Sequence, residues 1–126
     1  QKVAEYLNQN PKVDSVVYCG LPNDKYYELG QKYLPNGSCG VVSFRLKGGR
    51  EACEQFMNNL KLAAIETHVA DARTCCLHPA STTHRQMTDA ELEAGGVYPN
   101  LIRYSCGLED AQDLIADIKQ ALEAVK

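Results

Sequence analysis

The chain lacks any long apolar segment. No apolar run in its 126 residues approaches the roughly 20 residues that a membrane-spanning helix needs. No signal peptide is recognisable at its start. These absences predict a protein without a membrane partner, cytoplasmic by default.

The chain also lacks an excess of positive charge. Its formal net charge is -3 and its pI is near 5.6. A nucleic-acid-binding domain usually carries a basic surface, so we expect no nucleic-acid partner. The apolar content of 44% and the charged content of 23% are ordinary for a soluble protein, and the length suits a single domain over residues 1–126.

Paired metal-binding or redox cysteine motifs are absent. None of the six cysteines has CxxC spacing, and the adjacent Cys75 and Cys76 would point to opposite faces of a strand. Buried free thiols are the favoured interpretation, with a disulfide framework as the minor alternative. Cys76 and His78 would share a strand face, but no second pair at short spacing completes a zinc set, so no metal site is predicted.

No standard catalytic motif is complete. Gly48-Gly49 lacks the rest of a phosphate-binding fingerprint, and the GxSxG, HExxH and Walker patterns do not occur. The first residue is Gln1 rather than methionine, and the first helical segment has no capping residue before it. We therefore expect the chain to be cut from a longer protein, so an activity could depend on residues outside it.

Strands and helices alternate in the hydrophobic pattern. Several connections are too short for a parallel crossover, which predicts an α/β fold with a mixed, mainly antiparallel sheet of about four strands and helices chiefly on one face. The expected strands are 14–19, 39–46, 74–78 and 101–106, with a possible short strand at 63–65. The expected helices are 3–8, 25–34, 50–60, 88–94 and 111–125.

Two features of the sequence could contribute to a binding site. A polar loop follows the short strand that ends at Pro79, and loops at strand ends often carry binding groups. Arg103 lies in the last strand, where alternation places it on one face with Leu101 and Ser105. It is either an edge-strand charge reaching solvent or an anchor for a carboxylate, because guanidinium presents a rigid donor fork. Its place in the last strand favours the second interpretation.

Several motifs in order resemble one enzyme family. They are Asn10-Pro-Lys-Val13, Tyr18-Cys-Gly-Leu21, Gly40-Val-Val-Ser-Phe44, His78-Pro-Ala-Ser-Thr-Thr-His84 and Leu101-Ile-Arg-Tyr-Ser-Cys-Gly-Leu-Glu-Asp110, followed by Asp113-Leu-Ile-Ala-Asp117. Over nearly the whole length, the chain resembles the C-terminal, small domain of the Cys/Met-metabolism enzymes that use pyridoxal phosphate, the cystathionine γ-synthase-like group of fold type I.

Within this group, Val69-Ala-Asp-Ala-Arg-Thr74 and the Ser-Thr-Thr-His at 81–84 resemble the O-acetylhomoserine sulfhydrylase branch. The resemblance implies a transferase that replaces the acetate of O-acetylhomoserine by sulfide or a thiol, in methionine biosynthesis. The small domain of a methionine γ-lyase or a cystathionine γ-synthase or lyase is an alternative. A free-standing module for carboxylate binding or protein association is another.

The resemblance also implies roles for individual residues. Arg103 matches the arginine that pairs with the substrate α-carboxylate, and Thr74 matches a position that helps to hold it. Arg73 is expected to tune the pocket for the γ-substituent. Thr83 and His84 belong to a recognisable motif, and we assign them a supporting role only.

No catalytic, cofactor-binding or metal-binding residue is expected in this chain. None of its eight lysines lies in the Ser-x-x-Lys context of the family's cofactor lysine. The resemblance implies that pyridoxal phosphate binds to a large domain outside the chain, so the fragment is expected to be inactive alone. The expected partners are a small amino-acid substrate, that large domain and, in the longer protein, the other subunits of a homotetramer.

Overall fold

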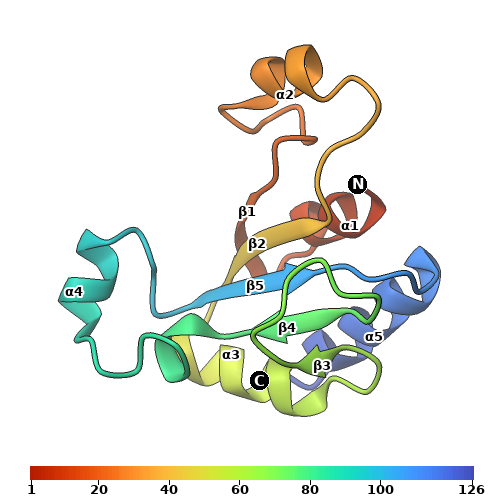
Figure 1. Cartoon of the computed structure of the whole chain (residues 1–126). Coiled ribbons are helices and arrows are strands. Elements are labelled where there is room, and N and C mark those ends of the chain that lie inside the picture. The colour runs from red at the N-terminus through yellow and green to blue at the C-terminus, as the bar shows by residue number, and fades with distance from the viewer.

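A computed structural model describes all 126 residues (Figure 1). The strands are β1 (Val13–Val17), β2 (Val41–Leu46), β3 (Ala64–Ile65), β4 (Cys75–Leu77) and β5 (Leu101–Ser105). The helices are α1 (Lys2–Gln9), α2 (Tyr27–Tyr33), α3 (Gly49–Asn59), α4 (Asp89–Ala94) and α5 (Ala111–Glu123), with a 3₁₀ turn η1 (Pro79–Ser81). Each expected element is present, and most ends differ by one or two residues from the pattern.

The strands form one mixed sheet in the order β1-β2-β5-β4-β3. All neighbours are antiparallel except β3 and β4, which are parallel. The predicted α/β class and the mainly antiparallel sheet are therefore confirmed. The fifth strand is the short segment at Ala64–Ile65 that the sequence indicated only weakly, because two residues are too few for a clear alternation.

The core lies on one face of this sheet. Along β2, Val42, Phe44 and Leu46 are buried while the residues between them are half-buried, as strand alternation requires. The buried side chains of α1, α3 and α5 join the same cluster. The rings of Phe44 and Phe56 meet edge to face, with centroids 5.8 Å apart.

Local sequence signals explain several helix ends. Thr88 and Glu91 form a capping box, in which the Thr88 hydroxyl accepts from the Glu91 backbone and the Glu91 carboxylate accepts from the Thr88 backbone. Gly96 adopts a φ of 76° just after α4, a left-handed conformation that glycine tolerates. The carboxylate of Asp110 accepts from Gln112 at the start of α5.

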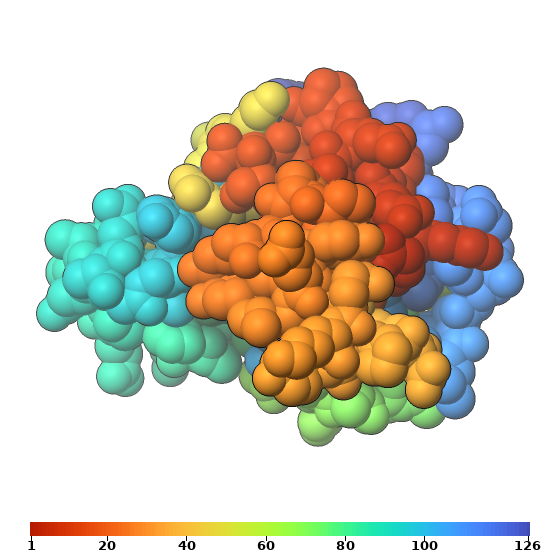
Figure 2. Space-filling view, turned by 90° about the horizontal axis from the view of Figure 1, so that it is seen from above, coloured from red at the N-terminus to blue at the C-terminus, as the bar shows by residue number.

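Two helices project from this layered body. In Figure 1 the α2 segment stands out above the sheet, and α4 extends at one side. Figure 2, seen from above, shows the orange α2 region in front and the cyan α4 region at the left edge. The large apolar side chains of α2 are not covered, because Leu29 and Tyr33 are exposed and Gly30 is the helix's buried residue. No helix is long and apolar enough to cross a membrane.

The connection from β3 to β4 positions the site described below. Because these neighbours are parallel, the chain must travel back along them between Ile65 and Cys75. It does so without a helix, through an irregular segment at residues 66–74. Figure 1 shows this green segment arching over β4 and β5, so it lies over a sheet that the helices cover from the other side.

Candidate functional site

Arg103 lies at the centre of the sheet, between β2 and β4. Its cross-strand neighbours are Ser43 and Leu77. Its side chain points away from the helices, because its neighbours in β5, Ile102 and Tyr104, are the residues buried in the core. The sequence therefore placed Arg103 on the correct face.

The guanidinium of Arg103 is only partly satisfied by the protein. Its Nη2 donates to the carbonyl oxygens of Thr67, at 2.6 Å, and His68, at 3.3 Å. Its Nε is buried and has no hydrogen-bond partner. A buried donor without an acceptor is costly, whereas an anion placed here would accept a charge-assisted hydrogen bond. This arrangement suits binding of a carboxylate.

Further contacts hold the 66–74 segment over this face. The Ser105 hydroxyl accepts from the backbone of Ala70, at 3.2 Å. Ala70 has a φ of 57°, which is uncommon for a residue with a side chain and strains the backbone. Leu108 donates its backbone N–H to the carbonyl of Ala72. Hydrogen bonds therefore hold the segment both to β5 and to the turn that follows β5.

Thr74 is fully buried, and its polar groups all have partners within the chain. Its hydroxyl donates to Oε2 of Glu109, at 2.7 Å, and accepts from the backbone of Gly107, at 2.8 Å. Its backbone N–H donates to Oε1 of Glu109, at 2.8 Å, and its carbonyl accepts from Ala64. Thr74 therefore links the start of β4 to the turn after β5.

Glu109 and Gly107 are both suited to the connection that Thr74 makes between β4 and the turn after β5. Burial raises the pKa of Glu109, but the hydrogen bonds from the Thr74 backbone and hydroxyl outweigh it, so the pKa lies below the ordinary glutamate value. A Cβ on Gly107 would collide with the backbone of Ala72 and Arg73, so only glycine allows this close approach.

The structure does not bring the side chains of Thr74 and Arg103 to one shared partner. Residues directly opposite in an antiparallel pair point to the same face, and Arg103 lies opposite Leu77. Thr74 is three residues before Leu77 and so belongs to the other face by alternation. The predicted contacts of both residues with one substrate carboxylate stay predictions, and this geometry favours an indirect part for Thr74.

The other predicted site residues are spread along the chain. Arg73 is exposed, makes no ion pair, and its backbone N–H donates to Asp71. Thr83 and His84 contact each other, Oγ1 to Nδ1 at 2.8 Å, beyond the other end of β4. Their roles stay predictions, and Arg73 is the one of the three that lies on the 66–74 segment.

No disulfide links the cysteines, and hydrogen bonds within the chain hold His78. All six cysteines are free thiols, and Cys76 is buried against Met57. His78 is buried and tied to the Ser81 hydroxyl and to the carbonyl of Pro99. Burial lowers the pKa of His78, which keeps its ring neutral near pH 7.

Sequence reasoning missed the partners that organise this region. Thr67 and His68 could not be recognised from a motif, because they contact Arg103 through their backbone carbonyls rather than their side chains. Asp117 left a readable signal, because it interrupts the apolar stripe of α5 between Leu114 and Ile118. A carboxylate at such a position needs donors, and it accepts from the backbone N–H groups of residues 61, 62 and 63 at 2.8 to 3.0 Å.

Comparison with known proteins decides the family. Residues 1–123 match the family model described as Cys/Met metabolism PLP-dependent enzyme. The chain belongs to this family. The resemblance inferred from the motifs is thus confirmed, and the small-domain fold of fold-type I enzymes with it.

Relatives in this Cys/Met metabolism family include proteins named sulfhydrylase, gamma-lyase and homocysteine synthase. An O-acetyl-L-homoserine sulfhydrylase from Leptospira meyeri is 41% identical over 125 residues, covering 98% of this chain and 28% of the relative. An L-methionine gamma-lyase from Treponema denticola is 44% identical over 124 residues, covering 98% of this chain and 30% of the relative. The chain thus spans less than a third of the length of these relatives.

A solved structure agrees with the fold. It is named an O-acetylhomoserine (thiol)-lyase, from Campylobacter jejuni, with N'-pyridoxyl-lysine-5'-monophosphate. The TM-score is 0.88 at 38% sequence identity, and the match covers 97% of this chain and 29% of that one. The family model and this solved structure therefore agree on the family.

The residues present here do not by themselves fit a covalently held pyridoxal phosphate. Seven of the eight lysines are exposed, and Lys12 is half-buried. The amino groups of Lys12 and Lys47 donate to backbone carbonyls of this chain, while those of Lys25 and Lys32 lie over neighbouring tyrosine rings. None of these four amino groups forms a hydrogen bond with Arg103 or with residues 66–74.

Proposed function

We propose that the chain is the substrate-carboxylate-binding C-terminal domain of a PLP-dependent transferase of the O-acetylhomoserine sulfhydrylase type. The longer protein replaces the γ-acetate of O-acetylhomoserine by sulfide or a thiol. In this proposal, a large domain outside residues 1–126 holds the cofactor, and this chain alone is inactive. The homotetramer and the cytoplasmic location expected from the sequence remain part of the proposal.

The observation that carries the proposal is the incomplete hydrogen bonding of the Arg103 guanidinium. One edge is anchored to the carbonyls of Thr67 and His68, and the buried Nε has no acceptor. Anchoring fixes the direction of the remaining donors, and holding a substrate in one orientation is a large part of catalysis. Arg103 thus binds and orients the α-carboxylate, while Thr74, Gly107 and Glu109 hold the chain beside it.

Substitution of Arg103 by lysine in the full-length enzyme tests this role. Lysine keeps the charge but loses the planar fork, which removes at least one charged hydrogen bond. We expect KM for the amino-acid substrate to rise about 10- to 100-fold, from a loss of about 1.5–3 kcal/mol, with KM for sulfide unchanged. The matched control is Arg45→Lys, since Arg45 shares the sheet face but already pairs with Asn100 and Asp14. An unchanged KM in R103K would refute the assignment.

The second candidate is a methionine γ-lyase. It is favoured by relatives of that name with identities of 39 to 44%, similar to those of the sulfhydrylases. The two reactions have different products. Acetate and homocysteine from O-acetylhomoserine plus sulfide support the transferase, whereas ammonia and a 2-oxo acid from methionine alone support the lyase. The same purified full-length protein is assayed for both.

A third candidate from another class is a free-standing module that keeps the fold for carboxylate binding or protein association. The discriminating observation is the reading frame on either side of residues 1–126. A neighbouring large domain with a lysine for the cofactor supports the enzyme. A complete reading frame of this length, with retained binding of small carboxylates, supports the module.

A further inference from the structure

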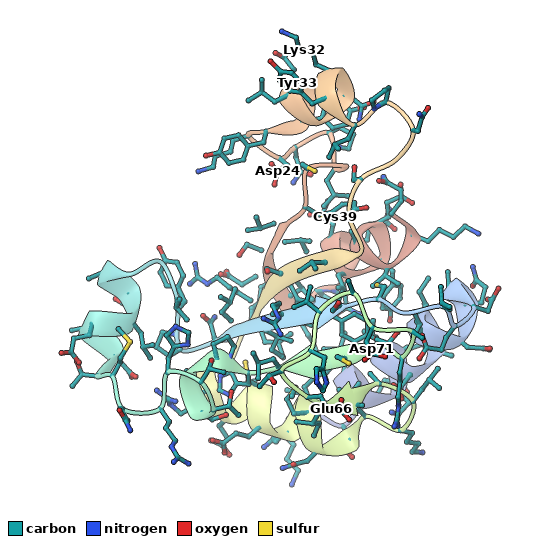
Figure 3. The ribbon with its side chains drawn as sticks, viewed as in Figure 1. Asp24, Lys32, Tyr33, Cys39, Glu66 and Asp71 are labelled. Carbon is teal, nitrogen blue, oxygen red and sulfur yellow. The ribbon has the colours of Figure 1, made fainter.

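Three side chains of different ligand types converge beside Arg103. A ring nitrogen of His68, a carboxylate oxygen of Glu66 and Sγ of Cys75 all lie within 4.8 Å of one another. Nδ1 of His68 is 2.8 Å from Oε2 of Glu66. Figure 3 shows Glu66 on the segment that leaves β3. A nitrogen, an oxygen and a sulfur ligand are the donors that zinc takes in proteins.

The backbone holds all three residues in place. Cys75 lies in β4 between Ala64 of β3 and Ser105 of β5. Glu66 donates its backbone N–H to the carbonyl of the neighbouring strand residue Cys76. The carbonyl of His68 accepts from Arg103. The site therefore combines a rigid thiol with two side chains whose backbone is anchored.

We propose that Glu66, His68 and Cys75 form a three-ligand site for a divalent ion of the zinc class. Bonds of about 2.0–2.3 Å in a tetrahedron put ligand atoms roughly 3.3–3.8 Å apart. The side chains of Glu66 and His68 are 45% and 65% exposed, so both can rotate the short distance required. The ion takes the place of the thiol proton of Cys75, which leaves to solvent, and a water completes the fourth position.

The ligand set selects this class of ion. Thiolate and imidazole favour borderline and soft ions, whereas magnesium and calcium prefer sites made of oxygen atoms. Cys75 now donates to the carbonyl of Arg73, at 3.3 Å, a weak contact that the ion would replace. The exposed side chains of Glu66 and His68 give the ion a path from solvent.

Sequence spacing did not reveal this site. Glu66 and His68 are two residues apart, but the thiol comes seven residues after His68, at the far end of the returning segment. The parallel pairing of β3 with β4 brings Ile65 opposite Cys76 and so closes the gap. A cluster built by strand pairing has no short motif to detect.

Metal titration of the full-length protein tests the site. Co²⁺ is added to metal-free protein, and the visible d–d absorption of tetrahedral cobalt is followed. Zn²⁺ affinity is then measured by competition with a chelator. We expect one equivalent to bind, and Glu66→Gln, His68→Gln and Cys75→Ser each to weaken binding more than about tenfold, since loss of an outer-shell partner alone costs 10- to 100-fold.

The controls separate a built site from surface binding. Cys39→Ser removes an exposed thiol elsewhere and should leave the affinity unchanged. Glu66→Gln alters an exposed side chain, so it keeps the test valid if a change at the buried Cys75 impairs folding. Binding that survives both Glu66→Gln and His68→Gln, or that is lost in Cys39→Ser, would be adventitious and would overturn the proposal. Absence of any bound cobalt would overturn it as well.

Discussion

At the scale of single residues, Arg103 and Thr74 differ in whether all their polar atoms have hydrogen-bond partners. Arg103 keeps an unpartnered buried donor, whereas every polar atom of Thr74 is used inside the chain. Strand alternation predicted the face of Arg103 correctly. It could not predict that Glu109, 35 residues away, takes both the hydroxyl and the backbone N–H of Thr74, because a turn after β5 determines where that carboxylate lies.

Replacement of Thr74 by valine is predicted to reduce stability. Valine keeps the shape of threonine but removes the hydroxyl that joins Glu109 to Gly107. Leaving the Gly107 N–H without an acceptor should lower the free energy of unfolding by about 1–3 kcal/mol. Denaturant unfolding measures the change. Thr67→Val is the control, because the exposed Thr67 hydroxyl makes no hydrogen bond and its loss should stay within about 0.5 kcal/mol.

Glu109 adds a pH dependence to the same link. Because its pKa is lowered in the folded chain, its stabilisation is full above the ordinary glutamate pKa and is lost as the pH falls through the folded value. Glu109→Gln should therefore lower stability at pH 7 and flatten the loss of stability on acidification. Unfolding midpoints at several pH values between neutral and about pH 3, below the ordinary glutamate value, measure this. Parallel curves for the two proteins would contradict it.

At the scale of elements, α5 is joined to the entry of β3 by one carboxylate. Asp117 is 6% exposed and accepts from three successive backbone N–H groups just before β3, and from the Gln120 side chain. This link sets where β3 starts and so where the 66–74 segment begins its return. The helix itself was predictable from its apolar stripe, but the partner of Asp117 was not, since it lies more than 50 residues away.

Asp117→Ala is predicted to be among the most damaging changes on α5. It leaves three N–H groups without their acceptor at a partly buried site, at a cost of about 3 kcal/mol or more. Asp117→Asn keeps one acceptor oxygen, so its stability should lie between those of the unchanged protein and Asp117→Ala. Asp113→Ala is the matched control, because Asp113 is exposed on the same helix and contributes about 1 kcal/mol or less through the helix dipole. Equal unfolding midpoints for D117A and D113A would contradict this account.

At the scale of the whole molecule, the sheet is covered unevenly. The helices α1, α3 and α5 fill one face, while the other face carries Arg103 beneath one irregular segment. The one-sided core could be predicted, because the apolar residues Val42, Phe44 and Leu46 alternate with Ser43 and Arg45 along β2. The placement of the returning segment could not, since it depends on a two-residue strand whose pairing gives no periodic signal. These features suit a chain that forms one half of a site.

That division leads to a prediction about the cofactor. If another domain holds pyridoxal phosphate, the isolated chain should show no specific lysine for it. Mixing residues 1–126 with pyridoxal phosphate, reducing with borohydride and mapping the peptides should reveal low labelling spread over the exposed lysines. Circular dichroism confirms that the chain is folded, and the full-length protein treated in the same way should give one dominant adduct. A single lysine labelled to one equivalent in the isolated chain would overturn the division, because this chain would then contain its own cofactor site.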